Sequence, residues 1–203
     1  MKRVGLLFVV ILMVTTACSA NTNTTTVTQD QNGGTSSGFN VTPTGRVGTS
    51  VGDTVPNLSI YDLEGNKHNL SDYRGQFVLF SMWATWCPSC RKEMPSMQKL
   101  YDELKDKGFV ILAYAADPRE SVEAVKEALK ADFAYVTFPV FSSAINKEAK
   151  DRMFRFGFPT NYLIDENGVI MQVFIGAVDW QGSVRIWIMR TMGLSVNEGT
   201  IND

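Results

Sequence analysis

The sequence predicts an α/β fold in which a central mixed β-sheet is flanked by helices, with a β-hairpin extension at its N-terminal end. Two near-continuous apolar runs, at residues 77–83 and 109–115, are typical of strands buried on both faces. Each run is followed by a segment whose apolar residues recur at helical spacing. Further along, Asn167-Gly168 separates two more apolar runs and indicates a hairpin. Alternating strands and helices followed by such a hairpin predict a mixed sheet covered on both faces.

The N-terminal hairpin is predicted from two short runs, 57–62 and 67–70, on either side of a turn that contains Gly65. The first long helix is predicted to begin at Pro88, because proline is favoured in the first helical turn, and to end at Gly108. Its apolar side is formed by residues at helical spacing, namely Cys90, Met94, Met97, Tyr101 and Leu104.

Three more helices are expected downstream. Asp117 followed by Pro118 has the pattern of a helix N-cap and a first-turn proline, so a helix is predicted to begin there. Further helices are predicted from Ser143 to Met153 and over residues 180–192, the last one ending at Gly193.

The first seventeen residues have the features of a targeting segment. Lys2 and Arg3 supply positive charge, and residues 4–14 form an apolar run of eleven. This run is too short to span a bilayer comfortably as a helix but suits the core of a signal peptide. Residues 1–17 are therefore predicted to be a signal peptide, cleaved before Cys18.

Ala17-Cys18 resembles the lipobox of bacterial lipoproteins, although the family prefers leucine where this chain has Thr15. The resemblance implies that Cys18 carries a diacylglycerol and anchors the chain to a membrane. The alternative is an ordinary cleaved signal that leaves Cys18 as a free thiol. Residues 18–50 are rich in Thr, Asn, Gly and Ser and predict a flexible linker. We expect one domain over residues 51–195 and a C-terminal tail at 196–203.

Charge excludes one class of partner. The net charge is −2, and removal of residues 1–17 leaves 17 basic against 21 acidic residues. Such a chain lacks the basic surface that nucleic-acid binding requires, so no nucleic acid is expected as a partner.

Cys87 and Cys90 stand at a predicted strand-to-helix junction with the spacing C-x-x-C. A thiol at a helix N-terminus faces unpaired backbone N–H groups and the positive end of the helix dipole, which favour the thiolate. Cys90 lies one turn into the helix, so its sulfur can resolve a mixed disulfide formed on Cys87. A purely structural disulfide and a zinc site are the alternatives, but zinc needs further ligands and only His68 is available. We expect no metal.

The same region resembles the TlpA/ResA-like thiol–disulfide oxidoreductases over about residues 51–195. The resemblance is carried by three segments of the chain: WATWCPSCRKEMP at 83–95, GFPT at 157–160, and PNL at 56–58 together with LSDYRG at 70–75. The first of these is highly specific, whereas the last alone is weak.

The resemblance implies a thioredoxin-like fold with a cis peptide before Pro159, which brings the Phe158 backbone near the cysteines to pair with an extended substrate. Trp86 and Pro88 are expected to shape the same substrate surface. Glu93 matches an acidic residue that tunes the active-site thiols in this family. A turn proline and a helix-start glutamate are the alternatives for Pro159 and Glu93.

The function implied by the resemblance is reduction of protein disulfides outside the cytoplasm, with Cys87 as nucleophile and Cys90 as resolving thiol. Cytochrome c maturation is one process that such reductants serve. Because the surroundings are oxidising, a membrane electron donor of the thiol-reductase type is expected as a partner. We expect a monomer without cofactor, anchored on the periplasmic or cell-surface side of a membrane.

Two alternative functions belong to related folds. A thiol peroxidase of the redoxin group would carry Thr-x-x-Cys or a similar peroxidatic site, where this chain has Trp86 followed by C-P-S-C. A copper chaperone or other metal-binding lipoprotein would use C-x-x-x-C and a distant histidine, whereas the single histidine here precedes the cysteines.

Overall fold

The computed structural model describes residues 41–117 and 119–196. The predicted signal peptide, the lipid-anchor cysteine Cys18 and residues 197–203 lie outside the described residues. Within the described ranges, no helix has the length and apolar character needed to cross a membrane.

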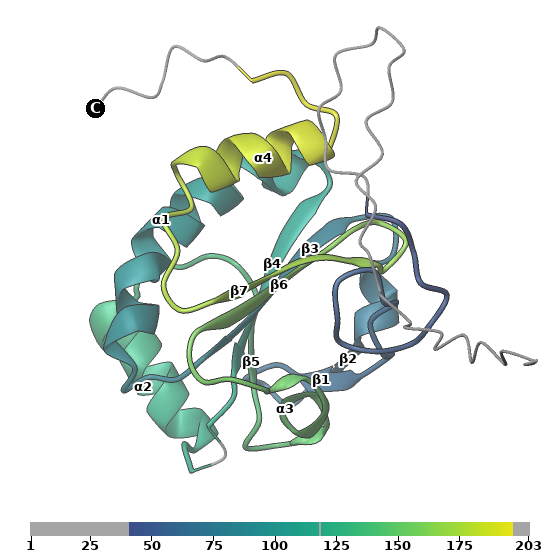
Figure 1. The fold of residues 1–203 in the computed structure, drawn as a ribbon. Coiled ribbons are helices and arrows are strands. Elements are labelled where there is room, and N and C mark those ends of the chain that lie inside the picture. Colours follow the sequence, from purple (N-terminus) through teal and green to yellow (C-terminus); the bar gives the residue numbers. More distant parts are fainter. Residues whose placement is uncertain (1–40, 118, 197–203) are drawn as a thin grey trace, which may run out of the picture. The chain divides into compact units, whose positions relative to one another are not determined.

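A five-stranded mixed sheet forms the centre of the domain, in the order β5-β4-β3-β6-β7 (Figure 1). β3 pairs in parallel with β4 and antiparallel with β6. The sheet strands are β3 (Phe77–Trp83), β4 (Phe109–Ala115), β5 (Val140–Ser142), β6 (Thr160–Ile164) and β7 (Ile170–Ile175). The helices are α1 (Pro88–Leu104), α2 (Val122–Asp132), α3 (Glu148–Met153) and α4 (Ser183–Thr191), with short 3₁₀ turns at Leu70–Tyr73 and Lys105–Lys107. A mixed sheet flanked by helices, with the hairpin extension, is the predicted fold.

Each face of the sheet has its own apolar core because successive strand residues point to opposite faces. Leu79 and Trp83 of β3 pack on the face covered by α1, α2 and α4, whereas Phe80 and Met82 pack on the opposite face. That opposite face is covered by α3 and the N-terminal hairpin (Figure 1). Burial of both faces explains why the two parallel strands have near-continuous apolar sequences.

The predicted hairpin is present as β1 (Ser59–Tyr61) paired antiparallel with β2 (Lys67–Asn69). Upstream of it, residues 41–50 contact the domain. The Thr44 amide donates to the Gly52 carbonyl at 2.8 Å, and Arg46 pairs with Asp53 at 3.1 Å. Contacts with the domain therefore extend upstream of residue 51, the predicted domain start.

The predicted start of the second helix at Asp117 is wrong. α2 begins at Val122, and its N-cap is Ser121, whose hydroxyl accepts a hydrogen bond from the Ala124 amide at 3.1 Å. The carboxylate of Asp117 does not cap the helix, because it accepts hydrogen bonds from Arg119 and from Trp86.

Two further helices begin later than predicted. α3 begins at Glu148 because Ser143 still belongs to the sheet edge, where its amide donates to the Ala115 carbonyl at 2.9 Å. α4 begins at Ser183, because Trp180, the predicted first residue, lies in a turn and is fully buried in the core.

Candidate active site

The carboxyl ends of β3 and β4 form the edge of the sheet at which the candidate site lies. These strands are parallel neighbours with Trp83 opposite Ala115, so the segments that follow them leave the sheet side by side. Met82 is opposite Thr160 on the other side of β3, which brings Pro159 to the same edge. In open α/β sheets this edge is the usual place for a functional site.

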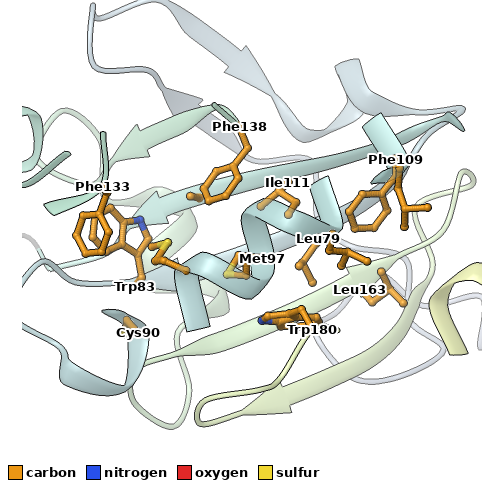
Figure 2. Close-up of a cluster of buried hydrophobic side chains, with 14 of the residues drawn as sticks. Leu79, Trp83, Cys90, Met97, Phe109, Ile111, Phe133, Phe138, Leu163 and Trp180 are labelled. Atoms are coloured by element: carbon orange, nitrogen blue, oxygen red, sulfur yellow. The ribbon is translucent and has the colours of Figure 1, made fainter. Parts of the chain in front are cut away.

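Cys87 and Cys90 form a disulfide at the N-terminus of α1. Cys87 is the N-cap residue and Pro88 occupies the first turn. The Cys90 amide donates a hydrogen bond to the Cys87 sulfur at 3.1 Å, so this backbone N–H would stabilise a thiolate there. Cys87 is 4% exposed and Cys90 is fully buried, next to Trp83 and Phe133 at one end of the core cluster (Figure 2).

The peptide bond between Phe158 and Pro159 is cis, as the resemblance implied. The Phe158 ring lies edge-on to Trp86 with ring centroids 5.8 Å apart, so the proline loop meets the segment that carries Cys87. Trp86 is 54% exposed, whereas Trp83 is entirely part of the core. Pro88, directly after Cys87, is also exposed, and Phe158 is half-buried.

Glu93 lies in α1 one turn after Cys90 and is only 2% exposed. Its carboxylate accepts hydrogen bonds from the Trp180 indole at 3.3 Å, the Val178 amide at 3.2 Å and the Asn161 side chain at 3.3 Å. Burial nevertheless dominates and raises the pKa of Glu93 to about 7. A solvent-facing helix-start glutamate, the alternative considered from the sequence, does not describe this residue.

The residues that surround Glu93 were missed by the sequence analysis. Asn161 and Trp180 hold the carboxylate from β6 and from the segment before α4, far along the chain. Ser81 of β3 is buried, and its hydroxyl has no hydrogen-bond partner among the described residues. His68 packs against Tyr73 and Phe141 beside β5, away from this constellation.

Two other carboxylates near the disulfide were also missed as site residues. Asp117 and Glu120 follow β4 and are hydrogen-bonded to Trp86 and Thr85, in the segment that precedes Cys87. Among residues 41–117 and 119–196, no group of three or more His, Cys, Asp or Glu side chains is arranged to hold a metal ion.

A mixed five-stranded sheet with a C-x-x-C disulfide at a helix N-terminus and a cis-proline loop beside it defines a thioredoxin-like thiol–disulfide oxidoreductase. The chain belongs to the AhpC/TSA family, whose model matches residues 51–173.

The curated relatives agree with this class. The chain is 36% identical over 137 residues to the thiol-disulfide oxidoreductase ResA of Geobacillus kaustophilus, covering 66% of this chain and 75% of the relative. It is 41% identical over 129 residues to ResA of Bacillus cereus, covering 62% and 70%. A thioredoxin-like protein, YneN of Bacillus subtilis, is 36% identical over 133 residues, covering 65% and 75%. The ResA-like resemblance predicted from the sequence is therefore confirmed.

Solved structures show the same fold. The thioredoxin domain of a thiol-disulfide oxidoreductase from Bacteroides vulgatus is similar with a TM-score of 0.58 and 31% identity, over 68% of this chain and 98% of that one. A thiol:disulfide interchange protein from Bacteroides sp. is similar with a TM-score of 0.57 and 28% identity, over 76% and 95%.

Proposed function

We propose that this chain is an extracytoplasmic, membrane-anchored reductant of protein disulfides, with Cys87 as the nucleophile and Cys90 as the resolving thiol. The observation that carries the assignment of roles is the position of Cys87 at the helix N-cap. Its sulfur accepts the Cys90 amide hydrogen bond, and Cys87 is the more exposed of the two residues. A thiolate at this position is stabilised before substrate arrives.

The proposed reaction has two exchange steps. The Cys87 thiolate attacks one sulfur of the substrate disulfide, and the other substrate sulfur leaves as a thiolate that takes up a proton. Cys90 then loses its proton and attacks the Cys87 sulfur, which releases the second substrate sulfur. The substrate gains two electrons, and the enzyme is left with the Cys87–Cys90 disulfide. A membrane thiol reductase would return the two electrons.

Glu93 is proposed to accept the proton that Cys90 loses. The carboxyl is buried one helical turn from Cys90, and a pKa of about 7 leaves both of its protonation states accessible at neutral pH. When ionised, its negative charge would also oppose premature ionisation of the neighbouring thiol. Pro159 and Phe158 are proposed to pair with the extended substrate, with Trp86 and Pro88 at the edge of the contact. Maturation of cytochrome c is the process in which we propose such a reductant acts.

Turnover with different acceptors tests this function. The chemically reduced protein is expected to reduce the disulfides of insulin. It should turn over hydrogen peroxide at least about 100-fold more slowly, because Trp86 followed by C-P-S-C stands where a thiol peroxidase carries its peroxidatic motif. Anaerobic copper titration of the dithiol form distinguishes the proposed reductase from the copper-chaperone alternative. Faster turnover of peroxide than of insulin, or stoichiometric tight copper binding without disulfide reduction, would contradict the proposal.

Membrane attachment is proposed to depend on Cys18, because a lipidated cysteine supplies more than one acyl chain and holds a soluble domain at a bilayer. Expressed in a bacterial host with its own signal, the wild type should partition into the detergent phase of a Triton X-114 extraction. The Cys18→Ala variant should appear in the aqueous phase. Wild-type protein found in the aqueous phase would mean that the cysteine is not lipidated.

A further inference from the structure

Two buried carboxylates that the proposed chemistry does not use lie directly behind the segment that carries Cys87. Asp117 is 4% exposed and Glu120 is 8% exposed, and both belong to the connection between β4 and α2. Together with Trp86 and Arg119 they line an open depression at the protein surface. The parallel pairing of β3 and β4 brings this connection next to residues 84–87, because the two strands end at the same level.

Asp117 fixes the orientation of Trp86. The indole Nε1–H of Trp86 donates a hydrogen bond to Asp117 Oδ2 at 2.7 Å, although the residue is exposed to solvent. Arg119 pairs with the same carboxylate at 2.6 Å, and its guanidinium carbon lies 5.9 Å from the centroid of the Trp86 ring. The Arg119 hydrogen bonds hold the pKa of Asp117 well below its usual range, so the carboxylate remains an acceptor at neutral pH.

Glu120 fixes the residue before Trp86. Its Oε1 atom accepts a hydrogen bond from the Thr85 amide at 2.9 Å and another from the Thr85 hydroxyl. The Thr85 carbonyl in turn accepts a hydrogen bond from Arg91 at 3.2 Å. Side chains therefore hold both the backbone N–H and the carbonyl of Thr85.

We propose that Asp117 and Glu120 are positioning residues that hold Thr85 and Trp86, so that the Trp86 ring and Phe158 form a fixed aromatic edge beside Cys87 that selects polypeptide disulfides. The inference rests on the proposed function, since it concerns how substrate reaches Cys87. An extended polypeptide must cross this edge, whereas a small disulfide reaches the sulfur without touching it. Loss of the hydrogen bond between Asp117 and Trp86 lets the Trp86 ring rotate. This rotation lowers the rate of reaction with protein disulfides more than the rate with small disulfides.

A double-mutant cycle on the bond between Asp117 and Trp86 tests this proposal. Reduced enzyme is assayed with insulin as the protein disulfide and with DTNB (5,5′-dithiobis(2-nitrobenzoic acid)) as the small one. Asp117→Ala and Trp86→Phe should each lower kcat/KM for insulin about 10-fold, which is the loss of one hydrogen bond to a charged group. The double variant should be no slower than the slower single variant. The rate of Asp117→Ala with DTNB should stay within about 2-fold of wild type.

Conservative variants separate positioning from a general effect on folding. Asp117→Asn keeps an oxygen that accepts from the indole and should retain most of the insulin activity. Trp86→Phe alters an exposed side chain, so it tests the bond even if Asp117→Ala does not fold. Asp102→Asn removes an exposed ion pair between Asp102 of α1 and Lys105 and is the matched control, expected to behave as wild type.

Several outcomes would overturn the proposal. Insulin and DTNB rates that fall together would show that Asp117 acts on Cys87 or on the whole fold. Effects that multiply in the double variant, or an unchanged insulin rate in Trp86→Phe, would show that the hydrogen bond does not position the ring. Failure of the wild type itself to react with either disulfide would instead refute the proposed function, because that reaction needs only Cys87 and Cys90.

Discussion

Replacement of Cys90 by serine should trap a covalent mixed disulfide between Cys87 and a substrate protein, and replacement of Cys87 should trap none. Cys87 is the N-cap of α1 with a backbone N–H aimed at its sulfur, whereas Cys90 is fully buried behind it. Only Cys87 can therefore make the first attack, and only Cys90 can release the adduct. Non-reducing gels of cell extracts, followed by mass spectrometry of the reducible bands, measure the trapped species.

Turnover should report the same division of roles. Each single cysteine variant should lose at least about 1000-fold in multiple-turnover reduction of insulin, because a serine hydroxyl cannot replace a thiolate as nucleophile. Burst experiments with one equivalent of substrate should show attack without release in Cys90→Ser, and no attack in Cys87→Ser. Ser89→Ala, at the exposed position between the cysteines, is a matched control that keeps both thiols. Adducts that form on Cys90 in the Cys87→Ser variant would reverse the assignment.

The strands of the sheet were predictable because a buried strand has a locally apolar sequence. β3 and β4 begin and end at the residues expected from their apolar runs, since a strand with both faces covered is apolar along most of its length. Helix starts were less predictable, because several residues with N-cap chemistry compete and distant contacts decide between them. Asp117 has the right side chain for a cap, but its carboxylate bonds to Trp86, 31 positions earlier.

The active-site pair was predictable for a similar reason, since C-x-x-C at a strand-to-helix junction places both sulfurs within reach by local geometry alone. The surroundings of Glu93 were not predictable from spacing. Its partners Asn161 and Trp180 lie 68 and 87 positions later and reach the carboxylate only because β6 lies beside β3 and α4 is joined to α1 by the pair Arg185–Glu103. A sequence therefore locates the reacting atoms more easily than the groups that set their protonation.

Replacement of Glu93 by glutamine should remove a large part of the pH dependence of stability. The pKa of Glu93 is raised from 4.5 to about 7 by burial in the folded protein. Between these values the folded state holds a proton that the unfolded state has released, so the free energy of unfolding falls as pH rises through this window. From pH 5 to pH 8 the loss attributable to Glu93 should be about 2–3 kcal/mol.

Urea unfolding of the oxidised proteins at pH 5 and pH 8 measures the contribution of Glu93 to the free energy of unfolding. In the oxidised proteins Cys87 and Cys90 form the disulfide, so these two thiols do not ionise. The wild type should lose stability relative to Glu93→Gln on going from pH 5 to pH 8, because the glutamine side chain does not ionise. All other titrating groups are common to both proteins and cancel in the comparison. Equal pH dependence in the two proteins would mean that the Glu93 carboxyl ionises in the folded state as easily as in water.

The reduced proteins test the catalytic role of the same carboxyl. Without a neighbouring negative charge the thiolates form at lower pH, so the alkylation profile of Glu93→Gln should shift to lower pH than that of the wild type.

Release of the mixed disulfide should nevertheless slow by about 10-fold or more in Glu93→Gln, because no group remains to accept the proton of Cys90. Asp102→Asn, which alters an exposed carboxylate of α1 whose partner is Lys105, is the matched control. Lower alkylation pKa values combined with slower release identify Glu93 as the proton acceptor, since a purely electrostatic role predicts faster exchange. Superimposable alkylation profiles for the two proteins would leave the buried carboxylate with a structural role only.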